Sequence, residues 1–114
     1  MDGCLFCTIA AGAIPADVVR QDELTLAFRD VNPQAPTHVL VIPRAHHADV
    51  GALAAADPEA LVAVHRTAAA VAADEGVAGS GWRLVFNTGR DAGQSVAHVH
   101  GHVLGGRHLE WPPG

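Results

Sequence analysis

Three histidines at alternate positions, His98, His100 and His102, place the strongest constraint on how this chain can fold. In a β-strand, side chains two positions apart project from the same face, so the three imidazoles would lie together. The neighbouring valines favour a strand, and Gly105-Gly106 is typical of its end. On a helix the same spacing would scatter the rings around the axis. We therefore predict a strand within residues 94–107 with one imidazole face.

An imidazole face suits two kinds of chemistry. Neutral imidazole is a common metal ligand. Its ordinary pKa of about 6.5 also leaves much of the ring neutral near neutral pH, so a ring nitrogen can act as a nucleophile or general base. The spacing alone does not distinguish these uses.

Composition narrows the class of protein. The chain has 114 residues, 49% of them hydrophobic and 4% aromatic, which predicts one domain with an aliphatic core. A net charge of −5 without a basic run argues against nucleic-acid binding. No stretch reaches the roughly 20 apolar residues of a membrane span, and the first residues lack a signal-peptide layout. We expect a cytoplasmic protein.

The two cysteines form a single Cys4-x-x-Cys7 motif. In a cytoplasmic chain a disulfide is less expected than a redox pair or half of a metal site. A thioredoxin-like motif should follow a strand, and no strand precedes this one. Half of a zinc site is the better interpretation if two more ligands exist.

The periodicity predicts an α+β fold with a five-stranded antiparallel sheet, a short N-terminal helix and one long helix, the helices lying on one side of the sheet. Asp57 suits the cap of the long helix and Pro58 its first position, and Gly76 suits its end. The expected elements are a helix at 4–11, strands at 18–21, 24–29 and 38–43, the long helix from 58, a strand at 82–87 and the histidine strand.

Some candidate residues keep an ordinary interpretation at this level. Asp30 opens a proline-marked loop, where it is either a turn residue or a ligand contact. A lone His38 at the start of a buried strand is usually structural, and His65 beside the apolar stripe of the long helix is read as structural.

Several motifs occur in an order that resembles one known family. They are Ile14-Pro15-Ala16, Leu26-Ala27-Phe28 with Asp30, residues 33–38, Val41-Ile42-Pro43, Asn87, Gly93-Gln94-Ser95-Val96, the three histidines and residues 104–107. Together they resemble the histidine triad (HIT) nucleotide-binding superfamily, which implies a HIT-like fold and a single HIT domain over residues 1–114. The final residues, 111–114, are similar to those of the Hint branch, the adenosine phosphoramidases.

Two departures qualify the resemblance. Gly101 stands where the family usually has a larger hydrophobic residue, which would loosen the strand. The Cys4/Cys7 pair is absent from animal Hint proteins, although bacterial members often have it. The chain thus resembles a bacterial, zinc-bearing member.

The resemblance implies covalent catalysis. His100 would attack the α-phosphorus of a purine nucleoside phosphoramidate, form a nucleotidyl-histidine and expel the amine, and water would then release AMP or GMP. His102 would hydrogen-bond a phosphate oxygen, and Ser95 would help to protonate the amine. The resemblance places the remaining substrate-binding residues at Asn87, Gly93 and Gln94 around the phosphate, Asp30 and Val31 at the ribose, Phe6, Ile9, Phe28 and Leu40 around the base, and His38.

The family needs no catalytic metal, so zinc is a separate question. In zinc-bearing relatives the two further ligands resemble His46, in the Pro-x-x-His segment, and His98, which would complete a structural site with Cys4 and Cys7. His47 is an adjacent competitor for the third position. His98 would then not be catalytic.

Relatives pair two protomers through their sheets and long helices, so the resemblance also implies a homodimer. Four other functions remain open. They are a metal-dependent hydrolase with an ion on the three histidines, a nucleotide-binding adaptor with little turnover, a dinucleoside polyphosphate hydrolase, and a nucleotidyl transferase of the galactose-1-phosphate uridylyltransferase kind.

Overall fold

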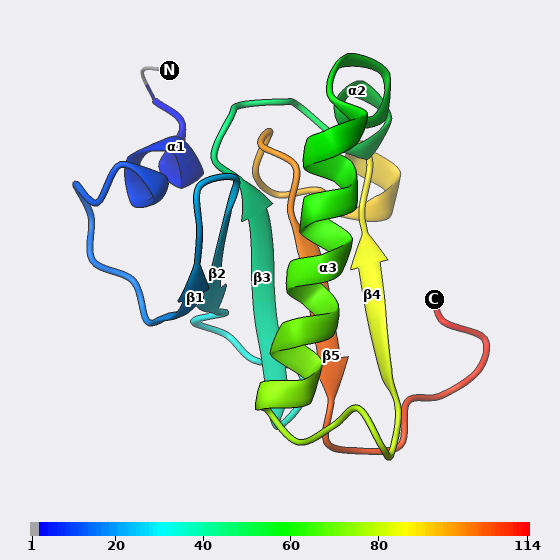
Figure 1. The fold of residues 1–114 in the computed structure, drawn as a ribbon. Helices are drawn as coiled ribbons and strands as arrows, with labels where there is room; N and C mark the ends of the chain where they lie inside the picture. Colours follow the sequence, from blue (N-terminus) through cyan, green and yellow to red (C-terminus); the bar gives the residue numbers. More distant parts are fainter. Residues whose placement is uncertain (1–2) are drawn as a thin grey trace.

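Five antiparallel strands form one sheet in the computed structural model, which describes residues 3–114. Figure 1 shows this sheet with the long helix α3 in front of it. The strand order is β1-β2-β3-β5-β4, so the predicted α+β fold is confirmed. The elements are α1 (Leu5–Ala10), β1 (Val18–Gln21), β2 (Thr25–Arg29), β3 (Thr37–Pro43), α2 (Val50–Ala56), α3 (Pro58–Asp74), β4 (Trp82–Phe86), a 3-10 turn (Arg90–Ala92) and β5 (Gly101–Gly105).

Helix α3 begins and ends where the sequence predicts. The Asp57 side chain accepts a hydrogen bond from the Ala60 backbone N–H, and Pro58 is the first helical residue, where its missing N–H costs nothing. Gly76 follows the helix with a φ of 76°, a backbone conformation that residues with a Cβ rarely adopt.

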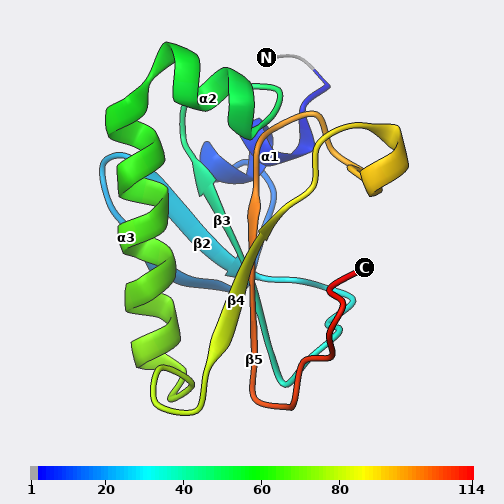
Figure 2. The ribbon, with the colours of Figure 1, turned by 90° about the vertical axis from the view of Figure 1, so that its right-hand side faces the viewer.

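The sheet has an apolar layer on each face. Val39 and Val41 of the fully buried strand β3 pack in the cluster that includes α3, whereas Leu40 and Ile42 join Phe6 of α1 in a second cluster. Figure 2 shows α3 on one side of the sheet and the C-terminal tail on the other. The expectation that the helices lie on one side is therefore wrong, because α1 buries its phenylalanine on the face opposite α3.

The histidine strand is shorter than predicted. Strand β5 begins at Gly101, and its ladder with β3 ends at the Val41–Gly101 pair. Before this point the Val99 N–H donates to the His47 carbonyl instead of to β3. The alternation still holds, since Val99 and Val103 both lie in the α3-side core. Only His102 of the three histidines is thus in the regular strand.

Helix α2 was not predicted. Asp49 caps it by accepting from the Ala52 N–H, but Leu53 is its only buried residue, so the segment carries no apolar periodicity. Among the described residues, no helix has the length and apolar character needed to cross a membrane.

Candidate functional site

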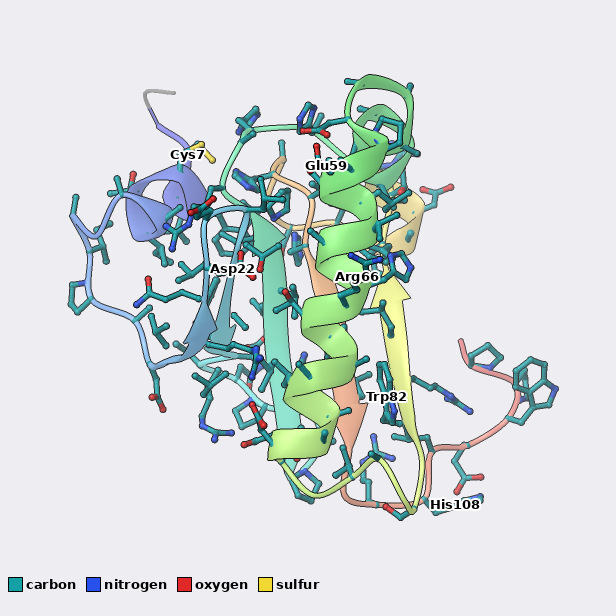
Figure 3. The ribbon with its side chains drawn as sticks, viewed as in Figure 1. Cys7, Asp22, Glu59, Arg66, Trp82 and His108 are labelled. Atoms are coloured by element: carbon teal, nitrogen blue, oxygen red, sulfur yellow. The ribbon has the colours of Figure 1, made fainter. Side chains whose placement is uncertain are left out.

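The two cysteines meet two histidines at one end of the sheet. Cys7 Sγ lies 3.3 Å from His46 Nδ1 and 3.4 Å from His98 Nδ1, and Cys4 Sγ lies 3.4 Å from the same His98 nitrogen. Figure 3 shows the Cys7 sulfur beside the loop that follows β3. The four ligand atoms lie within 4.8 Å of one another, so these residues form a cluster that could hold a metal ion.

The spacing and the ring orientation both suit a tetrahedral ion. With Zn–S of about 2.3 Å and Zn–N of about 2.0 Å, a tetrahedral site places sulfur and nitrogen about 3.5 Å apart. His98 Nε2–H donates to the Pro43 carbonyl at 2.9 Å, which leaves Nδ1 as a lone pair facing the two sulfurs. Burial lowers the pKa of His98, and the ring stays neutral, as a ligand must be. His47 is not part of the cluster.

His100 presents an ordered imidazole ring. Its Nδ1–H donates to the His98 carbonyl at 2.8 Å, so the lone pair belongs to Nε2. The side chain is buried, and the Phe6 ring packs edge-on against it with centroids 5.0 Å apart. The ring is held on both sides, which fixes the direction of Nε2.

A chain of hydrogen bonds fixes the proton on His102. The Gln34 backbone N–H donates to His38 Nδ1 at 3.0 Å, so the neutral His38 ring carries its proton on Nε2. That proton is donated to His102 Nδ1 at 2.9 Å. The remaining proton of His102 therefore lies on Nε2, which is buried without a hydrogen-bond partner among the described residues.

The imidazole rings of His38 and His102 are both neutral near neutral pH. Burial, followed by repulsion from His100 and His38, lowers the pKa of His102 to about 4. Burial also lowers the pKa of His38, partly offset by the Asp30 carboxylate, whose Oδ2 is 3.4 Å from His38 Nε2. His102 Nε2–H is consequently a neutral hydrogen-bond donor that is free to bind an acceptor on a ligand.

The tautomers of His38 and His102 make a second cluster of ligand-type atoms less suited to a metal ion than the cysteine cluster is. Asp30, His38 and His102 also bring ligand-type atoms together, but the Gln34 N–H on Nδ1 leaves His38 Nε2 without a lone pair. The three alternating histidines are divided between two sites. The ring nitrogens of His98 face a sulfur cluster and a carbonyl, so the arrangement does not favour a single ion on all three.

A cavity of about 300 Å³ lies beside Asp30. It is lined by Ile9, Pro15, Ala16, Asp17, Phe28, Arg29, Asp30 and Val31. Phe6 and Leu40, also expected around the base, lie in the buried cluster next to Phe28 instead of on the cavity wall. Asp30 Oδ1 accepts from the Asn32 N–H at 2.8 Å, which orients the carboxylate at the end of β2.

The loop before the histidines is held by the side chain of one residue. Gln94 spends its side chain inside the loop: Nε2 donates to the carbonyls of Ala48 and Val96, and Oε1 accepts from the Gly89 N–H. The side chains of Ser95 and Asn87 make no hydrogen bond to any described residue, and Gly93 is exposed with a φ of 79°. Gln94 thus holds the loop together.

A larger cavity, of about 760 Å³, lies away from the histidines between the β1–β2 turn and α3. Asp22, Glu59 and Arg66, which line it, are labelled in Figure 3. Acidic and basic side chains both line this cavity together with an exposed Leu24, and they do not form a set of groups that would act on one ligand.

Sequence reasoning missed two parts of the site. It gave no role to the backbone of Gln34, since a main-chain donor leaves no mark in the sequence. It quoted Pro15 and Ala16 only as a motif, although both line the cavity with Asp17 and Arg29.

Comparison with known proteins shows the family and the fold. The family profile "HIT domain" matches residues 11–109. The chain is 47% identical over 105 residues to the purine nucleoside phosphoramidase of Escherichia coli K12, covering 92% of this chain and 88% of that protein. It is 49% identical over 110 residues to a HIT-like protein of Synechococcus elongatus, covering 96% of each. The crystal structure of a HIT family hydrolase from Legionella pneumophila superposes with a TM-score of 0.94 at 50% identity, covering 98% of this chain and 100% of that one.

Proposed function

The chain belongs to the HIT domain family, and we propose that it hydrolyses purine nucleoside 5′-phosphoramidates at the α-phosphorus. One observation carries the proposal. The Nε2 lone pair of His100 and the unpartnered Nε2–H of His102 belong to neighbouring rings, with centroids 5.0 Å apart. A nucleophile beside a neutral donor suits attack on a phosphoryl group whose oxygens gain negative charge.

In the first step, His100 Nε2 attacks the α-phosphorus and the P–N bond to the amine breaks. The His98 carbonyl stabilises the positive charge that develops on the ring, because it accepts the Nδ1–H. The departing nitrogen takes the bonding electron pair and needs a proton. Ser95, whose hydroxyl has no other described partner, is proposed to deliver it.

In the second step, water attacks the phosphorus of the nucleotidyl-histidine and gives its proton to Ser95, which restores the hydroxyl. The bond to Nε2 breaks, and the nucleoside monophosphate leaves. His102 Nε2–H donates to a phosphoryl oxygen in both steps. His38 keeps this donor in place, because its own Nε2–H occupies His102 Nδ1. The Nε2–H dipole of His102, already oriented before the substrate binds, thus stabilises the negative charge of the phosphoryl group.

The cavity beside Asp30 is proposed to take the nucleoside. A carboxylate oriented by a backbone N–H suits the two ribose hydroxyls, and the apolar side chains of Ile9 and Phe28 suit a purine face. Asn87 and Gly93 lie on the segment between β4 and the histidines and are proposed to contact the phosphate. Phe6 and Leu40 support the base wall from behind.

The cysteine cluster is proposed to bind a structural Zn²⁺. The S···N separations of 3.3–3.4 Å and the lone pair at His98 Nδ1 fit such an ion, with Cys4, Cys7 and His46 as the other ligands. When bound, the ion supplies a fixed crosslink between α1 and the segment that carries His100.

A homodimer is also proposed. Strand β4 is an edge of the sheet, Val62 on α3 is 47% exposed, and Trp111 in the tail is 80% exposed. Unpaired edges and exposed large apolar side chains are common at subunit interfaces. Light scattering of the purified protein tests this directly.

The activity is tested with adenosine 5′-phosphoramidate, following AMP release by chromatography. We expect turnover by the native protein, loss in His100→Ala, and retention in His65→Ala, a matched control because His65 lies on α3 and bonds only its own helix. Parallel assays with the guanosine analogue and a diadenosine polyphosphate test the substrate class. Faster cleavage of the polyphosphate, or AMP binding without turnover, would contradict the proposal.

A further inference from the structure

His98 joins the two sites through different atoms. Its ring is fully buried, with Nδ1 3.4 Å from both cysteine sulfurs, while its backbone carbonyl accepts the Nδ1–H of His100 at 2.8 Å. The Nε2–H on the Pro43 carbonyl prevents the ring from turning freely. Whatever holds the His98 ring also holds the carbonyl that orients the nucleophile.

Phe6 makes a second connection, from the side of helix α1. It lies between the cysteines in the sequence, and its ring packs edge-on against His98 at 6.1 Å, His100 at 5.0 Å and Phe28 at 5.4 Å between centroids. It is the one buried residue of α1. Phe28 lines the cavity beside Asp30, so Phe6 contacts the cysteine cluster through His98, the proposed nucleophile His100, and one wall of that cavity.

Helix α1 depends on these contacts for its position. It has six residues, fewer than the roughly 12 that a helix needs to be even marginally stable alone. Its N-terminus is capped by Cys4 Sγ, which accepts from the Cys7 N–H at 3.2 Å. Without a metal, the hydrogen bonds that link Cys4 and Cys7 to His46 and His98 among the described residues are weak thiol–imidazole contacts, and the packing of Phe6 against His98 adds to them. A metal would replace them with four strong bonds.

We infer that Phe6 is a positioning residue through which metal binding at the cysteine cluster and nucleotide binding at His100 strengthen each other. The inference rests on the proposed function, because it requires that both ligands bind. An ion that fixes α1 reduces the freedom that Phe6 and His100 must lose when a nucleotide binds. By linkage, the nucleotide must tighten metal binding by the same factor.

The test measures metal affinity, independently of catalysis. Full-length metal-free protein is titrated with Zn²⁺ against a chromophoric chelator, with and without saturating AMP, and AMP binding is measured by calorimetry with and without Zn²⁺. We expect each ligand to lower the dissociation constant of the other by an equal factor of about five or more, the lower end of typical coupling.

Two variants locate the coupling. Phe6→Ala should bind both ligands with the factor reduced toward one, and Phe6→Leu, which keeps most of the buried volume, should show the same loss if Phe6→Ala folds poorly. Leu5→Ala is the matched control, because Leu5 is the adjacent helical residue and is 47% exposed. It should keep the full factor.

The outcomes are distinguishable. Binding of both ligands with no mutual effect would overturn this inference and leave the proposed function standing. An undiminished factor in both Phe6 variants would overturn the role of Phe6. Failure of the native protein to bind Zn²⁺ or AMP at all would overturn the corresponding part of the proposed function and this inference with it.

Discussion

His102 should lower the free energy of unfolding of the protein in mild acid. Its pKa falls from an ordinary 6.5 to about 4 on folding, because the ring is buried and lies near His100 and His38. The unfolded chain thus binds a proton that the folded chain resists. The resulting stability is fully present above about pH 6.5 and is lost as the pH falls towards 4. Between about pH 7.5 and 5, linkage gives a loss of about 2 kcal/mol from this group.

The perturbation that isolates this term is His102→Gln. The glutamine amide does not titrate, and its oxygen can accept the His38 Nε2–H in place of the His102 ring. Urea unfolding of both proteins at about pH 7.5 and 5 gives the two free-energy differences. We expect the native protein to lose about 2 kcal/mol more than the variant over this interval.

A shared background cancels in this comparison. Both proteins carry the same cysteine cluster, so acid release of a metal lowers both free energies of unfolding equally. His65→Gln serves as a control for the loss of a histidine at an exposed position of α3, away from His38 and His100. Parallel losses in the native protein and His102→Gln would refute the reasoning that His102 is held neutral by burial.

Three further predictions concern other parts of the molecule. Gly101→Val should lower the free energy of unfolding, measured in urea, by about 1–3 kcal/mol, because a Cβ at Gly101 would lie 2.8 Å from Leu84 Cδ1. The additional change Leu84→Ala should recover part of this loss. Free-energy losses of the two single variants that simply add in the double variant would contradict the clash. Asp30→Asn should raise the KM for a nucleoside phosphoramidate more than it lowers kcat, and an unchanged KM would remove Asp30 from the ribose contact. Cys7→Ser should lower bound zinc, measured by native mass spectrometry, together with the melting temperature; equal zinc content would argue against the cluster.

The sequence predicted the elements whose local signals agree with their tertiary roles. The cap at Asp57 with Pro58 fixed the start of α3, and the unbroken apolar run of β3 indicated a strand covered on both faces. The alternating histidines indicated a shared face, and the family resemblance indicated which residues to expect in the cysteine cluster.

Other features depend on contacts that local patterns do not encode. The face chosen by α1 follows from the fit of Phe6 against Phe28, and the start of β5 follows from the Val99 N–H bonding His47. Gly101 was expected to loosen the strand. In the structure the space above it is filled from β4 by Leu84 and Phe86, a compensation between strands that neither segment reveals alone.

The central claim is that His100 carries the nucleotide covalently. Its most direct test is rapid quenching of the native protein in alkaline denaturant during turnover of an adenosine phosphoramidate, followed by peptide mass spectrometry without acid treatment, because the P–N bond of the adduct is labile to acid. The account predicts an adenylylated peptide with the modification on the His100 side chain, and none in His100→Ala. Steady turnover with no modified peptide, or modification of His102 instead, would contradict it.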